Sequence, residues 1–131
     1  RARNNKLKPD DYPTIVALAN AYFDGGNLED AEKWYSTALS KKKDDNNVRT
    51  DLGLTFVFRE KADYDRAIQE FNTVLASEPN HIQALQNSVV AYMKKGDIAK
   101  AKERLTKLES VDPKNPAIAR LQKEISKTET K

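Results

Sequence analysis

The side chains that most often carry catalysis or bind metals are scarce in this sequence. It contains no cysteine and one histidine, His81. A lone histidine cannot build a metal site or a catalytic pair, and its position after Pro79-Asn80 favours a role at a helix N-terminus. The glycine-rich phosphate loops, the zinc-protease motif and the nucleophile elbow are all missing. We therefore predict a protein that is not an enzyme and has no cofactor, metal or small-molecule substrate.

Length and composition are typical of a small helical protein. The 131 residues suffice for one domain with a modest core, and 38% of them are hydrophobic and 33% charged. No apolar run approaches the roughly 18 residues that a membrane span needs. The chain begins with Arg1 rather than Met, so we expect a piece of a longer protein. Localisation stays unknown, with the cytoplasm and the soluble part of a membrane-anchored bacterial protein both open; the membrane anchor would then lie outside this fragment.

The net charge of +3 comes from the first residues of the chain. Four basic side chains stand within the first eight residues: Arg1, Arg3, Lys6 and Lys8. The remaining 123 residues hold 19 basic and 20 acidic side chains, a net charge of −1. A nucleic-acid-binding fold would carry its basic excess on the folded body. We therefore predict a disordered basic arm over residues 1–11 and no nucleic-acid partner.

Apolar residues recur at helical spacing in paired segments separated by turn residues. In the stretch 82–113, Leu85, Val89 and Tyr92 form one stripe, Lys95-Gly96-Asp97 interrupts it, and a second stripe follows from Ile98. The same periodicity predicts helices over residues 12–24, 28–40, 48–58, 64–76 and 117–127. Two short amphipathic helices cannot bury their faces alone, so each pair needs stacked neighbours.

The helical pairs repeat along the chain. A small residue stands early in each second helix, with spacings of 36 and 34 residues, and a large residue follows four positions later. An aromatic residue stands in each first helix. The three sets are Ala31, Ala67 and Ala101; Tyr35, Phe71 and Leu105; and Tyr22, Phe56 and Tyr92.

This pattern resembles the tetratricopeptide repeat (TPR) family over residues 12–115. The resemblance implies an all-α, right-handed superhelical solenoid of three TPR-like helix-turn-helix repeats with a C-terminal capping helix. The sequence departs from the family where a Trp is typical, because Ile15, Arg49 and Leu85 stand there. We expect repeats at 12–45, 46–81 and 82–115, a two-residue insertion in the turn of the second, and a capping helix with a frayed tail over 116–131.

The family resemblance also implies where a ligand would bind. In this family a segment of another protein lies in a concave groove lined by the first helices. Amide side chains suit such a ligand because they both donate to and accept from a peptide backbone. We expect Asn20, Asp51 and Asn87 at the centre of the groove. The full set of expected groove residues is Asn20, Asn47, Thr50, Asp51, Gln83, Gln86 and Asn87.

The resemblance further predicts a protein-protein interaction module that acts as a scaffold or adaptor. Chaperone-binding members clamp a C-terminal carboxylate with cations, but Val16, Gln83 and Asn87 occupy the matching positions here. Without these charges we expect no such clamp. The alternative is a structural module that self-associates as a homo-oligomer, or stacks within a larger repeat protein, without a specific groove ligand.

Overall fold

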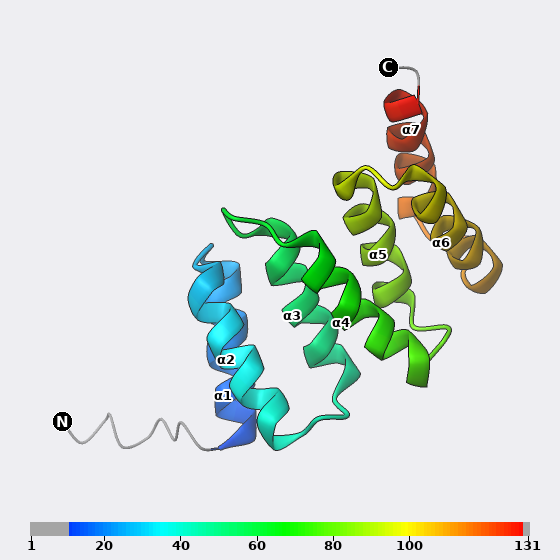
Figure 1. The fold of residues 1–131 in the computed structure, drawn as a ribbon. Helices are drawn as coiled ribbons and strands as arrows, with labels where there is room; N and C mark the ends of the chain where they lie inside the picture. Colours follow the sequence, from blue (N-terminus) through cyan, green and yellow to red (C-terminus); the bar gives the residue numbers. More distant parts are fainter. Residues whose placement is uncertain (1–10, 130–131) are drawn as a thin grey trace. The chain divides into compact units, whose positions relative to one another are not determined.

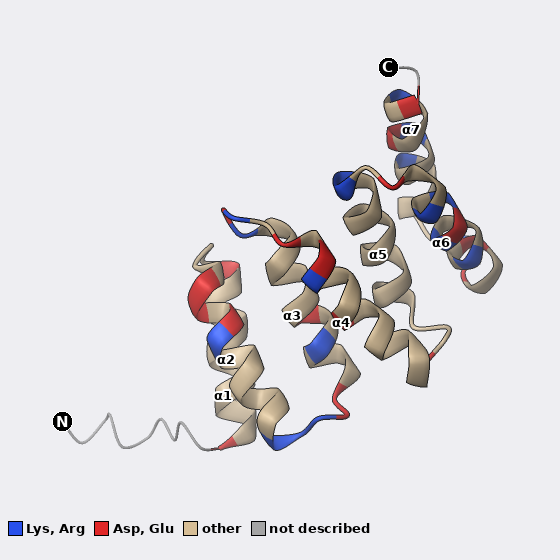
Figure 2. Ribbon diagram, viewed as in Figure 1, with Lys and Arg blue, Asp and Glu red and all other residues tan. Residues whose placement is uncertain are grey.

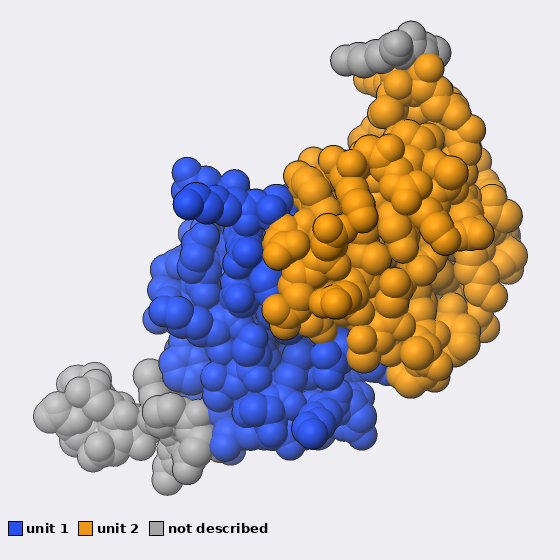
Figure 3. Space-filling model, in the orientation of Figure 1, with its two compact units in different colours: residues 1–62 blue, residues 63–131 orange. Residues whose placement is uncertain are grey.

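The computed structural model describes residues 11–129. The expected basic arm over residues 1–11, apart from Asp11, and the last two residues lie outside the described part. Within residues 11–129 the chain forms seven α-helices and no strand (Figure 1). The helices belong to two compact units, residues 1–62 and 63–131, which Figure 3 shows in different colours. Each unit is described by itself below.

The helices begin and end close to the residues that the apolar periodicity predicts. Unit 1 contains α1 (Tyr12–Asp24), α2 (Leu28–Lys41) and α3 (Asn46–Phe58). Unit 2 contains α4 (Tyr64–Ser77), α5 (Ile82–Lys95), α6 (Ile98–Val111) and α7 (Ala117–Glu129). The all-α prediction is therefore confirmed for the described residues.

A side chain caps the N-terminus of each of the helices α1 to α6 in the same way. In each case the residue before the helix accepts a hydrogen bond from the backbone N–H three positions later, as His81 Nδ1 does from Ala84 at 3.1 Å. Such a cap is worth about 1 kcal/mol because it satisfies a backbone donor that the helix cannot. The predicted helix-N-terminal role of His81 is thus confirmed. The capping residues are Asp11, Asn27, Asp45, Asp63, His81 and Asp97.

The connections differ in length and conformation. Residues 96–97 join α5 to α6, and Gly96 has φ +96°, a left-handed conformation that favours glycine. Residues 25–27 join α1 to α2, whereas the five residues 59–63 separate α3 from α4. At the other end of the chain, α7 continues through Glu129, beyond Lys127, where the sequence pattern ends.

Unit 1 is held together by small-to-large packing and by polar contacts at its ends. Ala19 and Ala31 are fully buried, so α1 and α2 approach closely, and α2 also packs on α3. Arg59, just after α3, forms an ion pair with Glu32 of α2 at 2.6 Å. The Tyr12 hydroxyl donates to Asp45 at 2.6 Å and so ties the start of α1 to the N-cap of α3.

Unit 2 shows the same kind of packing at four helix pairs. Helix α5 packs on α4 and α6, and α7 packs on both α6 and α5. The predicted large residues Phe71 and Leu105 are buried, as are Ala67 and Ala101. An ion pair links Lys95 to Asp65 at 2.5 Å. Residues of both charges occur along α6 and α7 (Figure 2), as expected for helices that face water on one side.

Replacing Leu121 tests whether α7 is an integral part of unit 2. Leu121 is fully buried and belongs to the apolar stripe of α7. We expect Leu121→Ala to lower the free energy of unfolding by about 2–5 kcal/mol, because it removes a buried side chain and leaves a cavity. Urea denaturation followed by circular dichroism measures the effect.

The matched control is Lys123→Ala, which truncates an exposed side chain two residues away on the same helix. A surface substitution of this kind changes stability by less than about 0.5 kcal/mol. Equal effects of the two substitutions would show that α7 does not contribute its apolar face to the core.

Candidate functional site

In unit 1, Asn20 on α1 is oriented by a buried tyrosine of α2. The hydroxyl of Tyr35 donates to Asn20 Oδ1 at 2.6 Å. Burial, together with the carboxylates of Asp51 and Asp24, raises the pKa of Tyr35, so the hydroxyl keeps its proton and remains a donor. Because the Asn20 oxygen is engaged, its amide group offers its two N–H donors to the exposed side of α1.

Asp51 on α3 is a carboxylate in an unfavourable position. Its side chain is half-buried, and no hydrogen bond or ion pair to it occurs within residues 11–129. Desolvation, followed by repulsion from Asp45 and Asp24, raises its pKa to about 6. A half-buried carboxylate with a raised pKa is a candidate for contact with a ligand.

The other two expected groove residues of unit 1 differ from each other. Asn47 is exposed in the first turn of α3. Thr50 is 2% exposed, and its hydroxyl donates to the backbone oxygen of Asn46 at 2.8 Å. Thr50 is therefore turned to its own helix, and its hydroxyl is not offered to a partner.

In unit 2, the expected groove residues lie along α5, and one of them is held by a loop. Gln86 Oε1 accepts a hydrogen bond from Asn115 Nδ2 at 3.2 Å. Asn115 precedes α7, and its own oxygen accepts from the backbone N–H of Ala117 at 2.8 Å. Gln83 is exposed and Asn87 is half-buried on the same helix. The Gln86 amide is thus fixed with its N–H donors directed away from Asn115.

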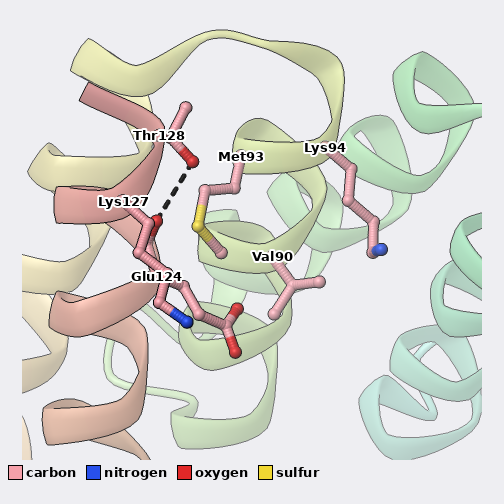
Figure 4. Close-up of a pocket in the computed structure, with 6 residues that line it drawn as sticks. All are labelled: Val90, Met93, Lys94, Glu124, Lys127 and Thr128. Carbon is pink, nitrogen blue, oxygen red and sulfur yellow. Dashed lines mark hydrogen bonds between the residues drawn. The ribbon is translucent and has the colours of Figure 1, made fainter. Parts of the chain in front are cut away.

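Two recesses lie between α5 and α7. We call the first the polar recess: it measures about 520 Å³, and Gln83, Gln86, Asp112, Asn115 and Arg120 contribute its polar lining. The second, the apolar recess, measures about 500 Å³ and is lined by Val90, Met93, Lys94, Glu124, Lys127 and Thr128. Figure 4 shows Met93 directed into the space beside α7, whereas Lys94 extends away from it.

The described part of the chain offers no arrangement for metal chemistry. Within residues 11–129, no three His, Cys, Asp or Glu side chains gather closely enough to hold a metal ion. The same residues contain no helix with the length and apolar character that crossing a bilayer requires.

The sequence pattern identifies the helix faces but misses two residues that orient them. It predicts Tyr35 only as a large inward side chain, and the hydroxyl contact with Asn20 depends on how closely α1 and α2 approach. It predicts Asn115 only as a turn residue. The hydrogen bond from Asn115 to Gln86 joins residues 29 positions apart, and no local pattern in the sequence signals it.

Comparison with models of known protein families identifies the family of this chain. A tetratricopeptide repeat model matches residues 12–45, and a second tetratricopeptide repeat model matches residues 58–125. The second match alone covers more than half of the 131 residues. The chain belongs to the tetratricopeptide repeat family, and its fold class is the all-α helical repeat of that family.

Solved structures of tetratricopeptide repeat domains share this fold. The first TPR of Spaghetti (RPAP3), bound to the HSP90 peptide SRMEEVD, has a TM-score of 0.82 at 16% identity, covering 92% of this chain and 96% of that one. The TPR2B domain of yeast Sti1, in complex with pHsp70, has a TM-score of 0.80 at 16% identity, covering 91% and 96%. YrrB, a TPR protein with an unusual peptide-binding site, has a TM-score of 0.80 at 21% identity, covering 86% and 57%.

The raised pKa of Asp51 predicts a specific pH dependence of stability. Because the folded-state pKa lies above the unfolded value, the folded protein binds the proton more tightly, and its stability falls as pH rises from about 4 to about 6. Asp51→Asn removes this titration. We expect the variant to be more stable than the wild type above pH 7, by up to about 2 kcal/mol, and to lose most of that advantage near pH 4.

Urea denaturation of both proteins at several pH values between 4 and 8 measures this difference. Glu60→Gln is the matched control, because Glu60 is exposed in the connection after α3. A stability difference between Asp51→Asn and wild type that does not change with pH would contradict the assignment.

Proposed function

We propose that this chain is a protein-protein interaction module that binds a segment of another protein and acts as a scaffold or adaptor. The partner segment contacts the polar faces of α1 and α3 in unit 1 and of α5 in unit 2. Asn20, Asp51 and Asn87 are the principal contacts. Membership of the tetratricopeptide repeat family supports the proposal. So do the HSP90-peptide complex of the Spaghetti (RPAP3) domain and the pHsp70 complex of the Sti1 domain.

The proposal rests chiefly on one observation, the half-buried and unpaired carboxylate of Asp51. A half-buried carboxylate near two others destabilises the folded chain at neutral pH, and no hydrogen bond or ion pair from the described residues offsets that cost. A donor from a partner would favour the charged form. Residues that lower the stability of the folded protein without forming a stabilising contact in it are typical of binding sites.

Asn20 and Asn87 provide hydrogen bonds that do not depend on one partner sequence. The Tyr35 hydroxyl orients the Asn20 amide, so its N–H donors are already placed when a partner backbone arrives. Such preorganisation strengthens binding because less conformational freedom is lost. Asn87 on α5 is half-buried and can both donate and accept.

The partner differs in chemistry from a chaperone C-terminus. At the positions where a carboxylate clamp needs cations, Val16 is half-buried, Gln83 is exposed and Asn87 is half-buried. None of these three carries a positive charge, so none can form an ion pair with a terminal carboxylate. Binding through a free C-terminal carboxylate is therefore not expected. In isothermal titration the peptide SRMEEVD should bind no more tightly than the same peptide with an amidated C-terminus.

A capture experiment tests the proposal. The wild-type chain and an Asn20→Ala/Asp51→Asn/Asn87→Ala variant are immobilised and exposed to an extract of the source cells. We expect a protein bound by the wild type to be reduced at least tenfold on the variant, because three polar contacts of about 0.5–1.5 kcal/mol each are lost. Quantitative mass spectrometry of the bound fraction gives the ratio.

The matched control replaces three exposed residues of α6, as Glu103→Ala/Lys107→Ala/Ser110→Ala. This control should capture as much partner as the wild type does. Equal capture by the Asn20/Asp51/Asn87 variant would place the interaction on another surface. If nothing is captured and the mass in solution rises with concentration, the self-association alternative replaces the proposal.

A further inference from the structure

The two recesses between α5 and α7 lie along a single line. The polar recess is lined by residues from the beginning of both helices, such as Gln83 and Arg120. The apolar recess is lined by residues from later in both helices, such as Met93 and Lys127. Helices α5 and α7 therefore run side by side in the same direction, and we call the line between them the α5–α7 groove.

The spacing of the recesses sets the length of the segment that could occupy both. Gln86 and Met93 are seven positions apart on one helix, which corresponds to about 10 Å. An extended chain covers this distance in about three residues. A short segment can therefore place one side chain in each recess.

The polar recess is built to bind an acceptor. The bond from Asn115 occupies the Gln86 oxygen and leaves its N–H donors, and Arg120 adds a guanidinium at the same recess. Asp112 also lines this recess, but its Oδ2 already accepts from Asn115 at 3.1 Å. Arg120 is paired only loosely with Glu124, at 3.7 Å and with more than 40% of both side chains exposed. Such an exposed ion pair contributes little to stability, so the Arg120 guanidinium can leave Glu124 for a stronger acceptor.

The apolar recess is built to bind an aliphatic side chain. Met93 and Val90 form its floor, and the methionine thioether adapts to side chains of different shape. The polar atoms nearest this floor are partly engaged within the chain, as Thr128 donates to the backbone oxygen of Glu124 at 3.0 Å. A partner side chain without polar groups fits this floor without leaving a polar atom unpaired.

We propose that the α5–α7 groove binds a partner segment that carries an acidic side chain and, about three residues away, an aliphatic one. The acidic side chain binds at Gln86 and Arg120, and the aliphatic one lies on Met93 and Val90. Asn115 is the positioning residue, because it presents Gln86 as a donor. The inference rests on the proposed function, since it names the partner chemistry for a site within unit 2 and adds α7 to the α5 surface.

A display experiment tests this chemistry with random peptides in place of the cellular partner. A phage library of random octapeptides, fused so that their C-termini are not free, is selected on the immobilised wild-type chain. The expected consensus contains Asp or Glu and, two to four positions away, Leu, Ile or Met. Enrichment of sequences without this pair, or no enrichment at all, would overturn the proposal.

Variants then locate the binding of an enriched peptide, synthesised with capped ends. Met93→Gln should weaken it about tenfold, because an aliphatic side chain loses its apolar floor. Arg120→Gln should weaken it by up to about fivefold, as expected for a partly exposed charge pair. Asn115→Ala should weaken the peptide but not its Glu→Ala analogue, because only the acidic side chain depends on the orientation of Gln86.

Lys107→Gln on α6 removes an equal charge outside the groove and should leave the affinity unchanged. Circular dichroism of every variant confirms that the helices are retained. Equal affinity of wild type, Met93→Gln and Arg120→Gln would remove the peptide from this groove.

The outcome is separable from that of the proposed function. The cell-extract partner could depend on Asn20, Asp51 and Asn87 but not on Met93 or Arg120. In that case the proposed interaction function is supported, and binding in the α5–α7 groove is contradicted. The display peptide could instead depend on Met93 and Arg120 while no cellular partner requires Asn20 or Asp51. In that case the α5–α7 groove is supported, and the proposed contacts at Asn20 and Asp51 are contradicted.

Discussion

The close approach of helices at buried alanines is the constraint on which the rest of this structure depends. Ala31, Ala67 and Ala101 are fully buried, each in the first turn of a second helix. A larger side chain at any of them would push the neighbouring helix away and separate the large residues that follow four positions later. The same spacing fixes the positions of the polar residues on the first helices.

Most of the helices could be predicted from the sequence, because the residues that determine them lie close together along the chain. Apolar periodicity located the helices, and turn residues such as Lys95-Gly96-Asp97 showed where one helix ends and the next begins. The role of His81 followed from its place beside a proline-containing turn. These features act within a few residues of one another, so one sequence suffices to find them.

The site was harder to predict because its determinants join distant residues. The family pattern located Asn20 and Gln86, but not Tyr35 or Asn115, which orient them. The raised pKa of Asp51 depends on neighbouring helices that remove water from it, and no spacing rule contains that information. The position of the Thr50 hydroxyl could have been predicted, because its determinant is local. A threonine within a helix often donates its hydroxyl to the backbone carbonyl four residues earlier.

The proposed contact at Asp51 would also make recognition sensitive to acidity. A partner group that donates to Asp51 stabilises its ionised form and lowers its pKa from about 6. Complex formation near that pH would then release a proton to the solvent. The enthalpy measured by calorimetry would vary with the ionisation heat of the buffer, and mild acidification would weaken the complex. A helix-repeat scaffold with one histidine, engaged in capping a helix, would in this way acquire a pH response from an aspartate.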